Sequence, residues 1–327
     1  MATLPVIVVL GEHADDRPSH LEALEGRVEL RVTGTAGLAE AMHGAQGLLL
    51  WDFFSSALRD VWDQCDALRW VHVAAAGVDR LVFPELAASH VVVTNAHGVF
   101  DRPIAEYVLG AVLAHAKQTH PSADLQRRHT WEHRETRSTT GARALVVGTG
   151  GIGREIARLL GAVGMQVTGA GRTARTRDPD FGEVVASADL ARHAGDVDYL
   201  VNAAPLTPAT RGLIDAAVLA ALPAHAHLVN IGRGESVVTD DLVAALRDRQ
   251  LDGATLDVVD PEPLPLGHPL WDLPGVVITP HMSGDVVGWR AALADQFVDN
   301  AQRWLTGEPL RGVVDTRLGY VPGAGRG

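Results

Sequence analysis

A glycine-rich turn in the middle of the chain, Gly148-x-Gly150-x-x-Gly153, has the residue types and spacing to bind a dinucleotide. It directly follows an apolar segment, 144–148, and directly precedes an amphipathic one, 154–160. The first glycine permits a tight turn, the second lets the backbone approach a pyrophosphate, and the third lets helix and strand pack closely. The helix N-terminus then offers N–H groups and a positive dipole end to the phosphates. The motif alone occurs in ordinary loops, but its strand–turn–helix context favours a dinucleotide site.

The next predicted strand, 166–170, is followed by Gly171-Arg172-Thr173, and these residues bear on which dinucleotide binds. NAD-specific folds place an Asp or Glu here to hold the ribose 2′-hydroxyl. This chain has no carboxylate here to repel a 2′-phosphate, and the Arg172 guanidinium can pair with one. Thr173 and Arg175 are further candidate contacts. The sequence therefore favours NADP(H). The alternative is that these side chains are solvated loop residues, and binding of NAD(H) stays open.

Three ionisable residues, Arg233, Glu262 and His281, each come where a predicted strand of the second half ends. In open α/β sheets, ligands bind beyond the carboxyl ends of the strands, so these side chains can converge on the cofactor. Two of them could instead be ordinary structural or surface residues. His281 is one of 15 histidines, and Glu262, between two prolines, could be a loop charge. Arg233, between two glycines, is harder to explain as a structural residue.

Several short motifs follow one another over nearly the whole chain. They are Ala76-Gly77-Val78-Asp79, Asn95 with Ala105-Glu106, the glycine-rich turn, the Arg233 segment, Asp257 with Pro261-Glu262-Pro263, His268-Pro269-Leu270-Trp271, and Pro280-His281. In this order and spacing they resemble the D-isomer-specific 2-hydroxyacid dehydrogenase family, with a likeness to glyoxylate/hydroxypyruvate reductases. The resemblance implies an NAD(P)-dependent oxidoreductase that interconverts a 2-keto acid and a 2-hydroxy acid.

The resemblance also implies a role for each strand-end residue. His281 would be the general acid/base, a role that suits a group titrating near neutral pH. Glu262 would bond the other imidazole nitrogen and favour the protonated ring. Arg233 would clamp the substrate carboxylate and polarise its carbonyl. Hydride would come from the nicotinamide, so no metal is expected.

Further contacts follow from the same resemblance. The N–H groups of Ala76 and Gly77 would receive the substrate carboxylate, as a nest of amide donors does. Asp257 would contact the nicotinamide carboxamide, and Thr210 would touch the cofactor or act as a helix cap. The candidate cofactor contacts are Gly148, Gly150, Gly151, Ile152, Gly153, Arg172, Thr173, Ala203, Pro205, Thr210, Ile231, Arg233, Asp257, His281, Ser283 and Gly284.

Apolar runs alternate with amphipathic segments in both halves, which predicts parallel sheets with helices on both faces. Strands are expected at 6–10, 28–32, 47–51, 70–74, 91–95, 144–148, 166–170, 199–203, 227–231, 254–259 and 276–279. Helical patterns cover 38–42, 55–68, 104–116 (opened by Pro103), 154–160 and 286–305. The polar segment 120–141 lacks apolar periodicity and is interpreted as a crossing segment between domains.

The expected fold class is α/β, with two doubly wound parallel-sheet domains. A flavodoxin-like substrate-binding domain would comprise 1–115 and 286–327, and a Rossmann domain would comprise 116–285. The helices 104–116 and 286–305 would connect the domains and act as a hinge. The family resemblance further implies a homodimer formed through the cofactor domains.

Composition excludes several classes of protein. The formal charge of −12 disfavours nucleic acids and anionic membranes as partners, because like charges repel. Cys65 is the only cysteine, so an intramolecular disulfide and a cysteine metal cluster are impossible. No stretch approaches the roughly 18 apolar residues of a membrane helix. The first apolar run is better interpreted as a buried strand than as a signal peptide, so a cytoplasmic location is expected.

The favoured function is an NADP(H)-preferring 2-keto acid reductase acting on glyoxylate, hydroxypyruvate or a larger 2-keto acid. One alternative is that the chain oxidises formate or phosphite, as related dehydrogenases do. The small residues 74–76 do not favour this alternative. A dinucleotide-sensing, corepressor-like binding protein is another. The complete set of Arg233, Glu262 and His281, with no appended interaction segment, argues against it.

Overall fold

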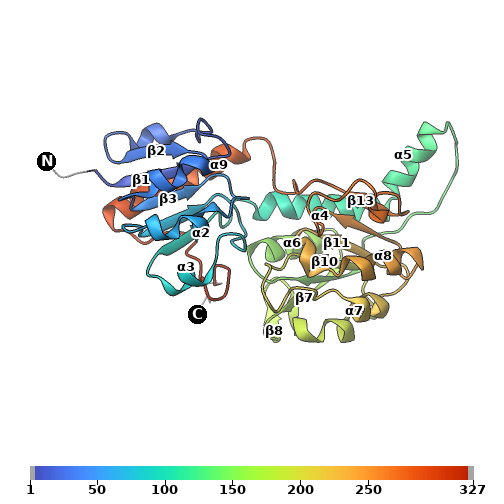
Figure 1. The fold of residues 1–327 in the computed structure, drawn as a ribbon. Coiled ribbons are helices and arrows are strands. Elements are labelled where there is room, and N and C mark those ends of the chain that lie inside the picture. The colour runs from blue at the N-terminus through green and yellow to red at the C-terminus, as the bar shows by residue number, and fades with distance from the viewer. Residues whose placement is uncertain (1–3, 323–327) are drawn as a thin grey trace. The chain divides into compact units, whose positions relative to one another are not determined.

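A computed structural model describes residues 4–322 of the chain. The chain divides into two compact units, each with its own sheet (Figure 1). Unit 1 comprises 1–100 and 286–327, and unit 2 comprises 101–285. The helix 104–116, which the sequence analysis assigned to the first domain, lies in unit 2, where it packs against the helix that follows the glycine-rich turn.

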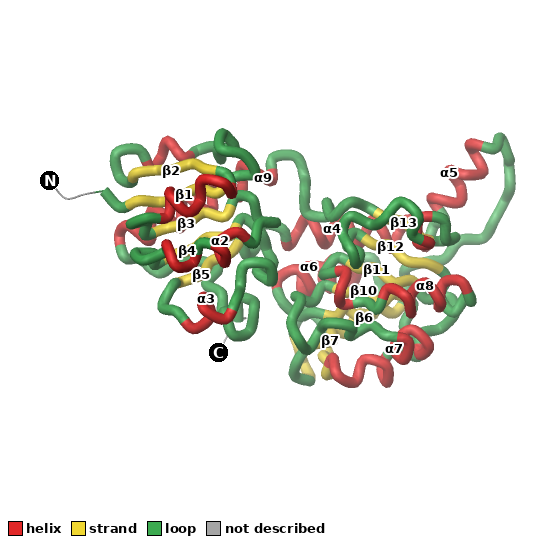
Figure 2. The backbone as a smooth tube through the Cα atoms, viewed as in Figure 1, coloured by secondary structure: helices red, strands yellow, loops and turns green. Residues whose placement is uncertain are grey.

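The sheet of unit 1 has five parallel strands in the order β2-β1-β3-β4-β5 (Figure 2). The strands are β1 (Val6–Leu10), β2 (Glu29–Thr33), β3 (Gly47–Leu50), β4 (Trp70–Val73) and β5 (Val92–Asn95). The helices are α1 (Leu38–Met42), α2 (Ala57–Asp60), α3 (Pro84–Ala88) and α9 (Trp289–Thr306). Every residue of β1, β3 and β4 is buried, as expected for central strands covered on both faces. This strand order is the flavodoxin-like one.

One end of the chain completes unit 1. On α9, the Phe297 ring stacks on Trp70 of β4 with ring centroids 5.5 Å apart. The tail then returns to the sheet, where Val313 forms an antiparallel bridge with Thr94 and Val314 is buried. The C-terminal segment is therefore part of the core of this unit.

The sheet of unit 2 has eight strands in the order β13-β12-β11-β10-β6-β7-β9-β8. They are β6 (Arg143–Val147), β7 (Gln166–Gly171), β8 (Arg175–Asp178), β9 (Gly182–Ala186), β10 (Tyr199–Asn202), β11 (His227–Asn230), β12 (Gly253–Leu256) and β13 (Val276–Ile278). The helices are α4 (Asp101–Ala116), α5 (Thr119–Arg127), α6 (Gly151–Ala162), α7 (Ala216–Ala221) and α8 (Thr239–Arg247). All neighbouring strands are parallel except β8 and β9. From β9 to β12 the order is that of a Rossmann fold, whose order reverses between β6 and β10.

The structure corrects the sequence analysis at three places. The hairpin β8–β9 was not predicted, because its first strand is short, polar and paired only at the sheet edge. The helix expected at 55–68 breaks at Val61, which leaves helical geometry with φ −111° and ψ 13°. A helix, α5 (Thr119–Arg127), covers the first part of the polar segment 120–141, although none of its residues is buried.

Two features stand out by their absence in residues 4–322. None of the helices there is long and apolar enough to cross a bilayer. That part of the chain also holds no group of three or more His, Cys, Asp and Glu side chains that could bind a metal ion.

Candidate active site

The glycine-rich turn joins β6 to α6, and two of its glycines are required by close approach. Gly148 has φ +102°, and a Cβ there would lie 2.6 Å from the carbonyl oxygen of Ala203. A Cβ on Gly153 would collide with the carbonyl oxygen of Gly148. The start of α6 is therefore held against the end of β6 by backbone contacts that a side chain would prevent.

Gly150 differs from its neighbours, because a Cβ there would meet no protein atom within 4 Å. Packing of the chain therefore does not require a glycine at this position. Gly151 and Ile152 follow it in the first turn of α6, whose first N–H groups have no partner within the helix. A backbone open on this side, beside a helix N-terminus, fits the pyrophosphate of a dinucleotide.

The end of β7 presents the residues expected to distinguish the two dinucleotides. Arg172 and Thr173 follow Gly171 and are exposed. Arg175, also considered a phosphate contact, lies in β8, and its Nε donates a 2.8 Å hydrogen bond to Asp178. The structure thus places Arg172 and Thr173 on the turn after β7 and pairs Arg175 with Asp178 of the hairpin.

Arg233 follows β11, on a turn held by two buried asparagines. Asn202, which ends β10, donates to Asn230 Oδ1 at 2.9 Å, and Asn230 Nδ2 donates to the carbonyl oxygen of Arg233 at 3.1 Å. A Cβ on Gly234 would collide with the carbonyl group of Val259. The glycine beside Arg233 is thus needed for close approach to the segment after β12.

Glu262 and His281 form the ion pair that the sequence analysis expected. His281 Nδ1 lies 3.0 Å from Glu262 Oε2, and Glu262 Oε1 accepts from the backbone N–H of Val259 at 3.2 Å. Burial alone would raise the pKa of Glu262. The hydrogen bond and charge of His281, with the Val259 N–H and the charge of Arg233, hold that pKa below its ordinary value. Glu262 is therefore an anion at neutral pH, and Arg233 is close enough to contribute to its charge state.

Asp257 holds the loop that carries His281. Its Oδ1 accepts from the Thr279 hydroxyl at 2.6 Å and from the Met282 N–H at 2.9 Å. Its Oδ2 accepts from the Ser283 N–H at 2.9 Å. His281 itself has φ 53°, in the left-handed region, and its N–H donates to the Asp257 carbonyl at 2.8 Å. The buried Asp257 carboxylate thus fixes the turn, and its remaining lone pair could accept from a carboxamide.

The other candidate contacts of unit 2 lie at the same edge of the sheet. Ala203 and Ile231 directly follow β10 and β11. Thr210 Oγ1 donates to the Pro205 carbonyl at 2.7 Å and accepts from the Thr207 N–H at 2.8 Å. Thr210 therefore closes the turn after β10 and does not cap a helix. Gly284 follows the buried Ser283 in the His281 loop.

The two candidate residues of unit 1 follow β4. Ala76 and Gly77 are half-buried, and the Ala76 carbonyl accepts from Asn95 Nδ2 at 2.5 Å. Asn95 ends the neighbouring strand β5. The turn is thus fixed at the carboxyl end of the unit 1 sheet.

Sequence reasoning missed the residues that hold the site together. Asn202 and Asn230 each end a fully buried strand and directly follow a Leu-Val pair, a signal that could have identified them. Thr279 and the hairpin residues Asp178 and Asp180 carried no such signal, because their partners come from distant segments.

Comparison with known proteins gives a consistent assignment. The sequence profile named D-isomer specific 2-hydroxyacid dehydrogenase, NAD binding domain, matches residues 109–283. Glyoxylate/hydroxypyruvate reductase A of Serratia proteamaculans is 32% identical over 263 residues, which are 77% of this chain and 82% of that protein.

Solved structures resemble the whole chain. An NADPH-dependent glyoxylate/hydroxypyruvate reductase from Sinorhizobium meliloti, in complex with NADP and sulfate, superposes with a TM-score of 0.81 at 28% identity. The match covers 97% of this chain and 100% of that one. A D-isomer specific 2-hydroxyacid dehydrogenase from Xanthobacter autotrophicus, in complex with NADPH and MES, gives 0.79 at 30% identity and covers 98% and 100%.

Proposed function

The chain belongs to the D-isomer specific 2-hydroxyacid dehydrogenase family, and we propose that it reduces a small 2-keto acid with NADPH. It is an NAD(P)-dependent oxidoreductase of the 2-hydroxyacid dehydrogenase type. Glyoxylate and hydroxypyruvate, which appear in the names of several relatives, are the first substrates to test. The preference for NADPH is supported by Arg172 and Thr173 at the end of β7, where no carboxylate opposes a 2′-phosphate.

We assign proton transfer to His281. Nδ1 is engaged by Glu262, so Nε2 is the ring atom that exchanges a proton with the keto oxygen. The Glu262 anion favours the imidazolium that donates this proton. When bound, the cofactor supplies the hydride. The single observation that carries this proposal is the His281–Glu262 pair at the carboxyl edge of the Rossmann sheet.

We assign the substrate carboxylate to Arg233 and to the N–H groups of Ala76 and Gly77. A guanidinium offers two parallel donors to a carboxylate, and backbone N–H groups in a turn form a concave anion site. Arg233 would also polarise the keto group and so stabilise the charge that develops on its oxygen. Unit 2 would thus hold the cofactor, and unit 1 would contribute to substrate binding.

The proposal is tested by oxidation of NADPH and NADH with a panel of 2-keto acids, comparing the wild type with His281→Gln. Turnover of the variant should fall by about 10²–10⁴-fold, the range expected for general acid–base catalysis. His225→Gln, which alters an exposed histidine paired with Asp198 at 2.9 Å, is the matched control. Turnover of His281→Gln within a few-fold of wild type contradicts the assignment. Tight NADPH binding without turnover of any 2-keto acid favours a dinucleotide-sensing protein.

The assembly is part of the same proposal. We infer a homodimer formed through unit 2, supported by the segment of α5 and the residues after it. In Figure 1 this segment extends away from the sheet of unit 2. None of the nine residues of α5 is buried, and Trp131 is fully exposed. An isolated helix shorter than about 12 residues is marginal in water, so α5 would gain stability from a partner.

The expected setting of the protein remains a prediction. We propose that it acts in the cytoplasm on a small-molecule acid, without nucleic acid or membrane as a partner. The formal charge of −12 supports the last point, because a chain of this charge is repelled by nucleic acids and anionic membranes.

A further inference from the structure

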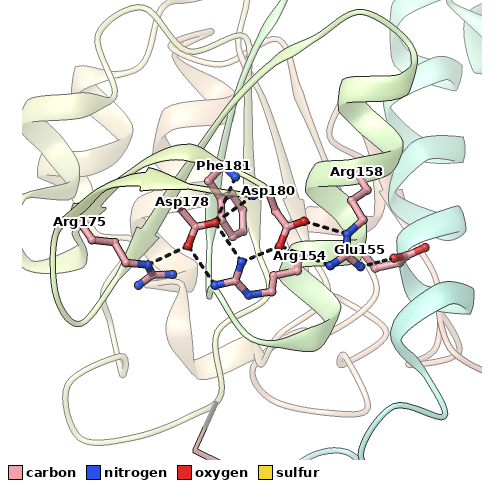
Figure 3. A network of polar contacts seen from close by, with 7 residues as sticks. All are labelled: Arg154, Glu155, Arg158, Arg175, Asp178, Asp180 and Phe181. Atoms are coloured by element: carbon pink, nitrogen blue, oxygen red, sulfur yellow. Dashed lines mark hydrogen bonds and ion pairs between the residues drawn. The ribbon is translucent and has the colours of Figure 1, made fainter. Parts of the chain in front are cut away.

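A network of seven residues ties the hairpin β8–β9 to α6 (Figure 3). Arg154 lies on α6, one residue after Gly153, and points toward the hairpin. Asp178 ends β8, and Asp180 follows it in the turn. Arg154, Asp178 and Asp180 are not among the candidate contacts of cofactor or substrate. The network is completed by Glu155, Arg158, Arg175 and Phe181.

Asp178 is the centre of this network. Its carboxylate accepts from Arg154 Nη1 at 2.9 Å and Nη2 at 3.0 Å, a bidentate pair, and from Arg175 Nε at 2.8 Å. It also accepts from the backbone N–H groups of Asp180 at 3.1 Å and Phe181 at 3.3 Å. The Asp178 side chain is only 2% exposed. A carboxylate so buried is retained as an anion only if its partners offset the loss of water.

The charge state of Asp178 agrees with this geometry. Burial alone would raise its pKa, but the hydrogen bonds from Arg154 and Arg175 hold the pKa far below its ordinary value. Asp178 is therefore an anion at neutral pH. Both arginines are thereby fixed, one on α6 and the other at the start of β8.

The network joins the two segments expected to contact phosphates. Arg154 is on the helix whose N-terminus is expected to bind the pyrophosphate, and Arg175 lies three residues after Arg172. The same region is tightly packed, since a Cβ on Gly169 of β7 would lie 2.9 Å from the Phe181 ring. A substitution at Asp178 would thus change the position or the order of the turn 172–174, although Asp178 itself would not contact a phosphate.

We propose that Asp178 is a positioning residue for recognition of the 2′-phosphate, which fixes the turn 172–174 relative to the N-terminus of α6. This inference rests on the proposed function, in which Arg172 contacts that phosphate. A guanidinium on an exposed turn pairs with an anion more tightly when the turn is already ordered, because less conformational entropy is lost on binding. Asp178 supplies that order through Arg154 and Arg175.

The test compares two nucleotides that differ only in the 2′-phosphate. The affinities of wild type and Asp178→Asn for adenosine 2′,5′-bisphosphate and for 5′-AMP are measured by titration calorimetry. The variant should lose about tenfold more affinity for the bisphosphate than for 5′-AMP, which corresponds to about 1.4 kcal/mol. The ratio of kcat/KM with NADPH to that with NADH should fall by the same factor. A buried pair that acted only in stability would lower the unfolding temperature without changing either ratio.

Two further variants serve as a replacement for Asp178→Asn and as a control. Arg154→Lys keeps the charge but removes the bidentate geometry, and it should shift the same ratios if Asp178→Asn does not fold. Asp198→Asn is the control, because Asp198 lies in the same unit and pairs with His225 at 2.9 Å but is no member of this network. Its ratios should equal those of wild type. Unchanged ratios in both Asp178→Asn and Arg154→Lys overturn the inference.

A double-mutant cycle of Asp178→Asn and Arg175→Gln shows whether Arg175 acts through Asp178 or contacts the phosphate itself. If Arg175 acts through Asp178, Arg175→Gln adds little to the loss already caused by Asp178→Asn. If Arg175 contacts the phosphate itself, the losses caused by the two substitutions add. A rise in the affinity of Asp178→Asn for the bisphosphate would also indicate that Arg175, once released, binds the phosphate. Either result overturns the inference. A failure of the proposed function is distinguishable, because then the wild type itself shows no preference for the bisphosphate and Arg172→Ala changes nothing.

Discussion

At the scale of single residues, the proposed proton transfer depends on the pairing of Glu262 with His281. The carboxylate has two partners, the imidazole and the Val259 N–H, and Arg233 adds its positive charge nearby. These interactions outweigh the effect of burial and keep the pKa of Glu262 below its ordinary value. The anion is therefore present above that lowered pKa and is lost only in acid. Across neutral pH it can stabilise an imidazolium on His281.

Replacing Glu262 by Gln should shift the pH dependence of 2-keto acid reduction. The neutral amide cannot stabilise the imidazolium. As the pH is raised, the rate of the variant should therefore begin to fall at a lower pH than that of the wild type. The direction of this change is the test, because the amide removes the negative charge that favours the protonated ring. The measurement is kcat/KM between pH 5.5 and 9, with Glu235→Gln of the neighbouring turn as control. A basic limb that stays in place in Glu262→Gln would contradict this role.

The sequence predicted the candidate catalytic side chains but not the residues that hold them. His281 and Glu262 could be found because their types and their places after strands signal chemistry, and the structure brings them within 3.0 Å. Asp257 was assigned to the cofactor alone, whereas most of its hydrogen-bonding capacity serves the His281 loop. Such roles depend on contacts between distant segments, which spacing along one chain does not reveal.

At the scale of elements, the turn between β6 and α6 contains glycines needed for two different reasons: Gly153 for packing of the chain and Gly150 for the proposed approach of the cofactor. Gly153→Ala would bring a Cβ against the Gly148 carbonyl, so we expect a loss of about 3 kcal/mol in the free energy of unfolding. Gly150→Ala adds a Cβ that meets no protein atom, at an ordinary φ of −80°, so stability should not fall. Its affinity for NADPH should nevertheless fall at least about tenfold, because the Cβ would occupy the approach of the pyrophosphate.

Urea unfolding and NADPH titration of both variants measure these effects. Gly161→Ala is the matched control, since Gly161 lies in α6 and a Cβ there would also meet no atom within 4 Å. It should gain up to about 1 kcal/mol of stability and bind NADPH as the wild type does. Normal NADPH binding by Gly150→Ala would show that the cofactor does not approach this backbone.

Most strands could be predicted because they are apolar and buried, and their predicted bounds differ from the observed ones by a few residues at most. The exception at this scale is β9, the third strand of the Rossmann order, together with its partner β8. Only Val184 and Val185 of β9 are buried, and the hairpin is held by the ion pairs of Asp178. Hydrophobic periodicity is absent where charge pairs supply the stability.

At the scale of the whole molecule, the polar segment 120–141 has two features that the sequence pattern did not predict. It contains a helix, α5, and it buries none of that helix. Sequence patterns detect helices through an apolar face turned to the chain's own core. A segment that packs on a second copy of the protein, as we propose for this one, would escape this signal.

Trp131→Ser should therefore weaken the homodimer. A tryptophan at the centre of an interface commonly contributes 2 kcal/mol or more, so the dimer dissociation constant should rise by about 30-fold or more. Light scattering over a range of concentrations should give twice the 34.7 kDa of one chain for the wild type and a lower mass for the variant. Leu266→Ser is the control, because Leu266 is a fully exposed apolar residue of unit 2 outside this segment. A wild type that is monomeric at all concentrations, or a Trp131→Ser dimer as stable as the wild type, would show that the segment does not form the interface.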